Sequence, residues 1–322
     1  MNKHFNLRIF SFGFIILVLL FLPAILATYW IYVLNLIFIY IILALGFNIL
    51  VGFAGQFAIC HVGFFGIGVY TYGLLNTNIP IPFLFSVLAG GIVAAVVGFL
   101  IAIPSIRMRD IYLAMVTFSF AEVLRWIFLN WDSVTGGPNG LRISPATISK
   151  MQLTTDQQVY YVIFPCMFLL VVLTANMAKS RLGRAFFSIK DSEAAAMACG
   201  IDVYKYKILA FGLSAFYAGV AGGLYGVLAG FIHPESLGFL QTILYLSMVV
   251  IGGLGTIPGP VIGACLLGIV PEFLREFSFL QEMLYGVVLM IFIVLMPLGI
   301  YGSMKARYEK MMRDKMQDVE TL

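Results

Sequence analysis

The chain has 322 residues, of which 61% are hydrophobic and only 11% are Asp, Glu, Lys or Arg, and its net charge is +4. Its mean hydropathy is +1.01, whereas a soluble protein needs a large polar surface. The apolar runs are long and do not alternate with polar residues, which excludes a soluble domain and a membrane β-barrel. The composition predicts an all-α polytopic membrane protein.

A membrane-spanning helix needs roughly 20 apolar residues, so the chain has room for about eight to ten spans. The candidate spans are roughly 9–28, 30–50, 57–76, 83–103, 111–130, 158–178, 208–230, 239–256, 259–274 and 283–303. The first resembles a signal peptide, but it is long and lacks a clean A-x-A site, so we expect it to be retained. We therefore expect a transmembrane domain over 1–304 and a charged tail over 305–322.

Lys and Arg residues are concentrated in four regions of the chain. Residues 1–8, 107–110, 179–207 and 305–322 hold 15 of the 19. Because the cytoplasmic loops of membrane proteins are enriched in Lys and Arg, these regions are predicted to face the cytoplasm, together with both termini. The protein is then expected in the cytoplasmic (inner) membrane as a multi-pass protein in contact with lipid.

A first glycine-rich block covers residues 48–70, NILVGFAGQFAICHVGFFGIGVY. Glycine in a membrane helix either allows close helix packing or breaks the helix, so that backbone groups line a cavity. Polar side chains at membrane depth pair with neighbours or face a pathway. Two interpretations follow: a broken helix beside a translocation route, or a packed interface that satisfies Gln56 and His61.

A second block, IGGLGTIPGPVIG (251–263), contains five glycines and two prolines, so a break or re-entrant turn is expected there. Gly52, Gly55, Gly63 and Gly68 recur at an offset of 200, which suggests an internal repeat of two halves or separate small-residue contacts. The span count gives both copies the same orientation, although it stays open whether an even or an odd number of spans separates them. The candidate pathway residues are Asn48, Gly52, Gly55, Gln56, His61, Gly252 and Gly255.

Several catalytic and cofactor motifs are missing from the sequence. It has no G-x-x-x-x-G-K-[ST] phosphate loop, no H-E-x-x-H and no G-x-S-x-G. The four cysteines are scattered, and His61 alone makes no metal site. We therefore expect no catalytic residue, no metal and no cofactor bound by this chain, and no nucleic-acid partner. Energy for uphill transport would have to come from another protein.

The segment Lys179 to Lys207 contains nine charged residues between two long apolar blocks, so we expect it in water. Within it, SIKDSEAAAMACG (188–200) predicts a short helix that Asp191 or Ser192 caps and Gly200 ends. Its small-residue face suits a groove on another protein. The alternative is an interfacial helix that lies on anionic lipid.

Residues 183–225, GRAFFSIKDSEAAAMACGIDVYKYKILAFGLSAFYAGVAGGLY, resemble the cytoplasmic coupling loop and following span of branched-chain amino-acid ABC transporter permeases. GFNILVGFAGQ (46–56), the segment 109–141 and IGGLGTIPGPVIGA (251–264) are also similar to that family. One departure is Ala58-Ile59-Cys60, where the family usually has a Ser and then a Leu-Gly pair. The resemblance and the cap together indicate an ATPase-coupling set of Gly183, Arg184, Asp191, Glu193, Ala194, Ala195 and Gly200.

The resemblance implies a division of labour among several proteins. A second, homologous permease subunit would complete the pathway, two cytoplasmic ATP-binding-cassette ATPases would hydrolyse the ATP, and an external solute-binding protein would deliver branched-chain amino acids. Related permeases carry urea, amides, other amino acids or sugars, so the solute stays open. A stand-alone secondary transporter or channel is the alternative from another class, although the spans hardly provide ion-coupling carboxylates; a membrane-embedded enzyme would need paired catalytic groups.

Overall fold

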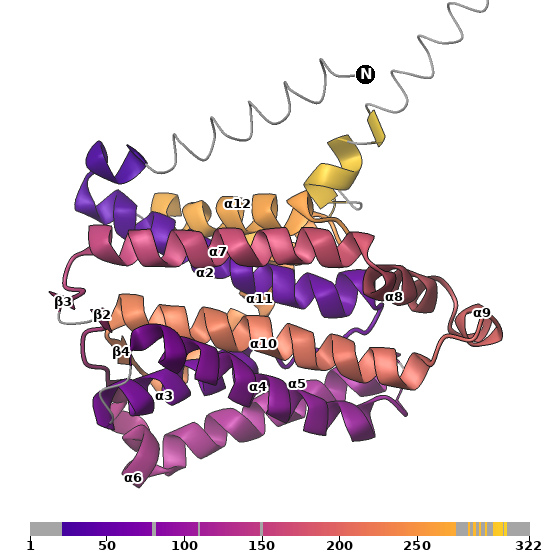
Figure 1. Ribbon diagram of the computed structural model, residues 1–322, viewed down its shortest axis with the longest axis horizontal. Coiled ribbons are helices and arrows are strands. Elements are labelled where there is room, and N and C mark those ends of the chain that lie inside the picture. Colours follow the sequence, from indigo (N-terminus) through magenta and orange to yellow (C-terminus); the bar gives the residue numbers. More distant parts are fainter. Residues whose placement is uncertain are drawn as a thin grey trace, which may run out of the picture.

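A computed structural model describes residues 21–78, 82–108, 110–148 and 151–274, together with residues 283, 286–287, 290, 294, 299–304 and 306–307. The described part is a bundle of long helices with a few two-residue strands (Figure 1). Five of its helices are long and apolar enough to cross a membrane, and two shorter apolar helices accompany them. The prediction of an all-α polytopic membrane protein is confirmed.

The predicted spans agree with the observed helices to within a few residues. The helices in chain order are η1 (Leu22–Ala24), α2 (Thr28–Phe47), η2 (Asn48–Phe53), α3 (His61–Asn78), α4 (Phe83–Ser105), α5 (Asp110–Asn130), α6 (Asp132–Thr135), η3 (Gly137–Asn139), α7 (Asp156–Lys179), α8 (Arg181–Asp191), α9 (Glu193–Ala198), α10 (Val203–Ala229), η4 (Pro234–Leu237), α11 (Phe239–Gly252) and α12 (Pro258–Leu274). The predicted spans 9–28 and 283–303, and the tail 305–322, lie wholly or mostly outside the described residues. The total number of spans therefore stays a prediction.

Two helices form the centre of the bundle. The continuous helix of α2 and η2, and helix α10, are 89% and 72% buried over their most apolar windows. Helices α4, α5 and α7 are 33% or less buried over theirs and surround the two central helices. Large apolar side chains on α4 and α5, such as Phe85, Leu100 and Tyr112, are exposed, as expected where lipid is the solvent.

Small residues let α10 pack closely against α3 and α4. A Cβ added to Gly68 of α3 would lie 2.0 Å from the carbonyl oxygen of Gly219 on α10. One added to Gly98 of α4 would lie 2.6 Å from the Cβ of Ala215. Such contacts are a main source of helix association in lipid, where apolar burial alone gives little driving force.

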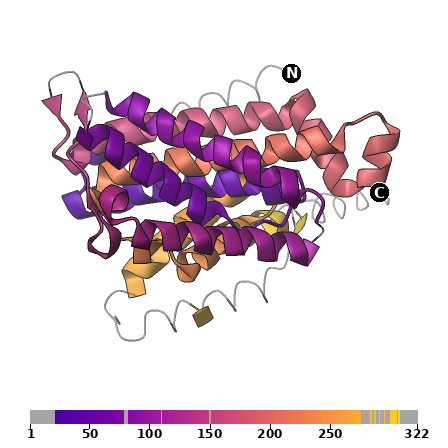
Figure 2. The ribbon, with the colours of Figure 1, turned by 90° about the horizontal axis from the view of Figure 1, so that it is seen from below.

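The short strands and the two short helices α8 and α9 lie at opposite ends of the bundle (Figures 1 and 2). At one end, which we call the strand end, β1 (Leu141–Arg142) pairs with β4 (Phe231–Ile232), and β2 (Thr147–Ile148) pairs with β3 (Met151–Gln152), both antiparallel. Positive φ angles at Gly136, Gly137 and Gly140 explain the tight turns that this glycine-rich sequence predicts. Helices α8 and α9 lie at the other end, which we call the coupling end.

The two glycine-rich blocks form two helical hairpins of the same orientation. Each hairpin consists of a helix, a break with a positive-φ glycine (Gly55, φ +69°; Gly255, φ +77°), and a returning helix. The first helices are parallel, because the Tyr40 ring lies 5.8 Å from the Tyr245 ring and, further along both helices, Asn48 bonds Gly255. The orientation is the one that the span count indicated.

Candidate functional site: the meeting point of two helix breaks and the coupling helices

The breaks in the two hairpins meet at the coupling end of the bundle, and Asn48 joins them. Its side chain donates a hydrogen bond from Nδ2 to the Thr256 carbonyl (2.8 Å) and accepts one at Oδ1 from the Gly255 amide (2.9 Å). Asn48 is fully buried, so these bonds satisfy both ends of its amide in a region without water. One side chain thereby fixes the relative position of segments about 200 residues apart.

The first break is a real interruption of the helix. The π-helical turn η2 ends at Phe53, residues 55–60 are not helical, and α3 begins at His61. π-helical turns occur frequently at functional sites. The pathway interpretation consists of a broken helix and a translocation route beside it, and the structure shows the broken helix. Whether solute passes beside it stays a prediction.

Gly52 and Gly255 allow the two breaks to approach each other. A Cβ at Gly52 would lie 2.0 Å from the Oδ1 atom of Asn48 and 2.7 Å from the Gly255 nitrogen. At Gly252, the end of α11, a Cβ would lie 2.0 Å from the carbonyl oxygen of Gly259 in α12. Of the four predicted glycines, Gly52, Gly252 and Gly255 therefore lie where backbone meets backbone, and a Cβ at Gly55 would meet Lys190 at 3.1 Å.

Gln56 and His61, the two polar residues predicted near the pathway, differ in their surroundings. His61 is 1% exposed; its Nε2 atom lies 2.6 Å from the Ser214 hydroxyl, and its ring stacks on Phe47. These contacts match the packed-interface interpretation for His61. Gln56 is 4% exposed, and neither polar atom of its amide has a hydrogen-bond partner among the described residues.

The coupling segment Lys179–Lys207 agrees with the prediction in α9 and differs from it in two ways. The predicted short helix is α9, because the Ser192 side chain caps its start by accepting from the Ala195 amide and Gly200 follows its end. The residues before the cap form a separate helix, α8, that the sequence did not predict. The segment is not wholly in water, because α10 already begins at Val203 and Lys207 is buried within the bundle. A buried lysine needs a paired carboxylate, and Glu193 supplies it here, so charge alone did not mark the end of the loop.

The predicted coupling residues lie mainly on the exposed side of this segment. Gly183 is buried where α8 turns against the end of α7, and the Nη1 atom of Arg184 donates to the Lys179 carbonyl (3.1 Å). Gly200 has φ +80° and ends α9. The residues Asp191, Glu193, Ala194, Ala195 and Gly200 are all exposed. Their exposure leaves α9 accessible from outside the bundle.

Lys190, on α8, links the coupling segment to both breaks, and the sequence reasoning missed it. Its Nζ atom donates to the Gly52 carbonyl at 2.8 Å, and a Cβ at Gly255 would lie 3.1 Å from the same nitrogen. The last carbonyls of a helix lack intrahelical partners and carry partial negative charge, so an ammonium group stabilises them. The signal available in the sequence was the strong amphipathicity of α8 with a lysine near its end.

Two ion pairs hold the start of α10, and they differ in burial. Lys207 pairs with Glu193 at 2.5 Å, and the Lys207 side chain is only 10% exposed. Lys205 pairs with Asp202 at 2.9 Å, and the Lys205 side chain is 81% exposed. The hydrogen bond from Lys205 holds the pKa of Asp202 below its ordinary value. The buried pair belongs to the site, whereas the exposed pair lies on the surface and contributes little to the free energy of unfolding.

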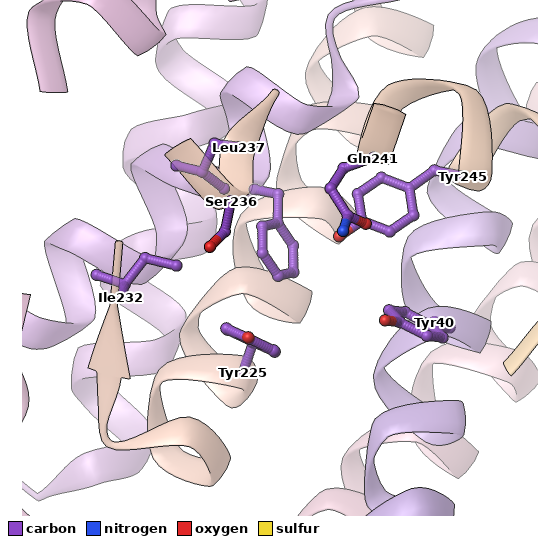
Figure 3. Close-up of a pocket in the computed structure, with 8 residues that line it drawn as sticks. Tyr40, Tyr225, Ile232, Ser236, Leu237, Gln241 and Tyr245 are labelled. Atoms are coloured by element: carbon purple, nitrogen blue, oxygen red, sulfur yellow. The ribbon is translucent and has the colours of Figure 1, made fainter. Parts of the chain in front are cut away.

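Two cavities adjoin these helices. One lies at the coupling end, has a volume of about 300 Å³, and is lined in part by Gln56, Glu193 and Lys207. The other, of about 40 Å³, lies toward the strand end between α2, α10 and α11 and is lined by tyrosines, with Gln241 and Tyr245 facing Tyr40 and Tyr225 (Figure 3). The smaller one holds only a water or two.

Comparisons with known proteins identify the family. Residues 29–296 match the model of the branched-chain amino acid transport system permease component. The chain belongs to this family. The relatives are permease proteins of high-affinity branched-chain amino acid transport systems. LivM of Escherichia coli is 32% identical over 288 residues (81% of this chain, 67% of LivM), and LivH of the same organism is 30% identical over 152 (47% and 48%). BraD of Pseudomonas aeruginosa is 32% identical over 158 residues (48% of each chain), and no solved structure matches.

Among the described residues, no group of three or more His, Cys, Asp or Glu side chains is placed to hold a metal ion.

The family and the geometry agree on the kind of protein. Both indicate a multi-pass permease. Helices α8 and α9, Lys190 and the two breaks form one contiguous arrangement at the coupling end.

Proposed function

We propose that this chain is a transmembrane permease subunit of an ATP-driven importer for branched-chain amino acids, and that it has no enzymatic activity of its own. The observation that carries the proposal is the contact between Lys190 and Gly52, which connects an exposed pair of short helices to both helix breaks. The family membership and the names of the relatives favour leucine, isoleucine and valine as the solutes.

The partners follow from the same arrangement. A second permease of the same family would complete the pathway, and a cytoplasmic ATP-binding-cassette ATPase would dock on α9 of each permease. A binding protein on the opposite side would deliver the solute. The chain would bind no cofactor, since ATP would be bound and hydrolysed by the ATPases. The excess of Lys and Arg near α8 and α9 favours a cytoplasmic location for the coupling end.

Mechanically, ATP-driven movement of the docked ATPases would shift α9 and α8, and Lys190 would transmit the shift to the breaks. A protein with two packed arrangements responds to such a push by changing their populations. Asn48 would make both breaks move together, because it bonds Thr256 and Gly255 at once. From α8 inward, the connecting contacts are the hydrogen bond of Lys190 to Gly52 and the two hydrogen bonds of Asn48.

The decisive experiment is uptake of labelled leucine into proteoliposomes that contain this chain, the second permease and the ATPases, with the binding protein outside. We expect uptake that requires ATP and that stops when the ATPases carry a substitution that blocks hydrolysis. Excess unlabelled isoleucine and valine should compete, and urea and acetamide should not. Uptake that continues without ATPases, driven by an ion gradient, would instead identify a secondary transporter.

A further inference from the structure

The proposed mechanism does not use the cavity of about 300 Å³ at the coupling end. It lies between the first helix break, the start of α5 and the two helices α9 and α10. Its volume is at the lower end of the range for small-molecule sites, roughly 300–1,000 Å³. The cavity is thus suited to a small solute.

The polar groups of the cavity have unused hydrogen-bonding capacity. The Lys207 ammonium has three donors, of which Glu193 takes one, and the described residues provide it with no other acceptor. Gln56 also lines the cavity, is 4% exposed, and has neither its Oε1 nor its Nε2 atom paired among the described residues. Both amide atoms are closed to solvent, and a buried amide without partners is unfavourable, so a polar ligand toward which the side chain turns would relieve this cost.

The remaining wall is apolar. Phe57, Met108 and Leu113 contribute to the lining, and Leu113 is 5% exposed. The cavity therefore combines an anion and a cation 2.5 Å apart, an unpaired amide and an apolar surface. A free amino acid with an apolar side chain has the matching groups: a carboxylate and an ammonium on one carbon, and a hydrocarbon side chain.

We infer that this cavity is a binding site for a zwitterionic amino acid with an apolar side chain. Its carboxylate accepts from the free donors of Lys207, and its ammonium donates to Glu193. The Gln56 side chain turns toward the ligand so that its buried amide takes the remaining bonds, and the ligand's side chain lies on Phe57, Met108 and Leu113. The ion pair need not break, because both of its members have capacity left. The inference rests on the proposed function, which makes such an amino acid the cargo.

A ligand in this site would contact three elements, two of which, α9 and the first break, the proposed mechanism moves. Glu193 is the first residue of α9, Lys207 lies in α10, and Gln56 lies in the first break. A bound amino acid therefore ties the helix on which the ATPase would dock to the membrane core. Under the proposed orientation the site faces the cytoplasm, where imported solute accumulates, so its occupancy restrains the movement that drives uptake.

The test is leucine binding to the purified membrane complex of this chain, the second permease and the ATPases, without the binding protein, measured by titration calorimetry. We expect saturable binding of leucine, and weak or no binding of leucinol, which lacks the carboxylate, and of 4-methylpentanoate, which lacks the ammonium. The double variant Lys207→Met/Glu193→Gln should weaken leucine binding by about tenfold to a hundredfold, as loss of charged hydrogen bonds predicts.

The exposed ion pair on the same helix supplies the matched control. Lys205→Met/Asp202→Asn removes the same charges two to nine residues away, and it should leave leucine binding unchanged. A further variant, Gln56→Leu, should keep or raise the melting temperature of the complex, because it removes a buried unpaired amide, and should still weaken leucine binding. A purely structural role for these residues would not separate stability from binding in this way.

The results that would overturn the inference are specific. They are an absence of saturable leucine binding, equal binding of leucine and leucinol, or equal effects of the two double variants. Failure of the proposed function is distinguishable, since it is read from ATP-dependent leucine uptake by the wild-type complex. If the wild-type complex takes up leucine but the Lys207→Met/Glu193→Gln variant binds leucine as well as the wild type, the cavity site is excluded and the proposed function stands.

Discussion

At the scale of single residues, Gly52 has no room for a side chain in the candidate site. A Cβ there would lie 2.0 Å from the Asn48 Oδ1 atom, and that oxygen accepts the hydrogen bond from Gly255. We expect Gly52→Ala to displace Asn48, to destabilise the protein by about 1–3 kcal/mol through overpacking, and to abolish most uptake. Thermal unfolding of the purified complex and leucine uptake check the two effects.

Gly286 provides the control for that substitution. A Cβ added there meets no described residue within 4 Å, so Gly286→Ala is expected to leave stability and uptake near wild-type values. If Gly52→Ala were as harmless as Gly286→Ala, the close approach of the two breaks would be contradicted.

Asn48 itself shows how far residue-level reasoning from sequence can reach. A buried asparagine in a membrane helix indicates a polar contact or a pathway, and the contact is what the structure shows. Its partners, Thr256 and Gly255, were unpredictable from the sequence because they are backbone groups about 200 residues away. Ser214, whose side-chain hydroxyl contacts His61, was unpredictable because it lies 153 residues away in the sequence.

At the scale of elements, Lys190 determines how α8 contacts the two breaks. Lys190→Met keeps the apolar stem and removes the donor to the Gly52 carbonyl. A hydrogen bond from a charged group contributes about 1.5–3 kcal/mol, so we expect a lower melting temperature and less leucine imported per ATP hydrolysed. The measurement is the ratio of uptake to ATP hydrolysis in proteoliposomes.

Lys205→Met is the matched control for this variant, because Lys205 is an exposed lysine of the same coupling segment that bonds only Asp202 nearby. It should leave the ratio unchanged. A normal ratio in the Lys190→Met complex, at normal assembly, would show that the coupling segment acts on the membrane core by another contact.

Helix α9 depends on its two ends because it has only six residues. Ser192 caps its start, and Gly200, at φ +80°, ends it. We expect Gly200→Val to destabilise this end by roughly 1–2 kcal/mol, since a β-branched residue is strained in the left-handed region, and to uncouple ATP hydrolysis from uptake. Gly200→Asn, which tolerates this conformation, should retain coupling, and equal behaviour of the two variants would exclude the backbone explanation.

The elements also show where sequence reasoning succeeded and where it failed. Long apolar runs and glycine-proline clusters are local features, so the helices and the two breaks were predicted closely. The short helix α9 was predicted from its cap, whereas α8 was missed, because the polar face of α8 is typical of a water-exposed loop. Its other face, with Phe186 and Ile189 buried, becomes evident only when the bundle is present.

At the scale of the whole molecule, charge is unequally divided between the two ends of the bundle. Within the described part of the chain, the coupling end contains Arg107, Lys179, Arg181, Arg184, Lys190, Lys205 and Lys207. The strand end has Arg142, and Arg125 lies near it in an ion pair with Glu122. This asymmetry predicts a cytoplasmic coupling end and an external strand end.

The natural cysteines allow a direct test of that orientation. Cys199 is exposed and follows α9 directly, whereas Cys60 is buried and Cys166 and Cys265 are only partly exposed within the bundle. In cells that express the chain without its ATPases, we expect a membrane-impermeant maleimide to label Cys199 in inside-out vesicles but not in intact spheroplasts. Cys199→Ser should remove this labelling. Labelling from the outside alone would reverse the orientation, and the ATPases would then have no access to α9.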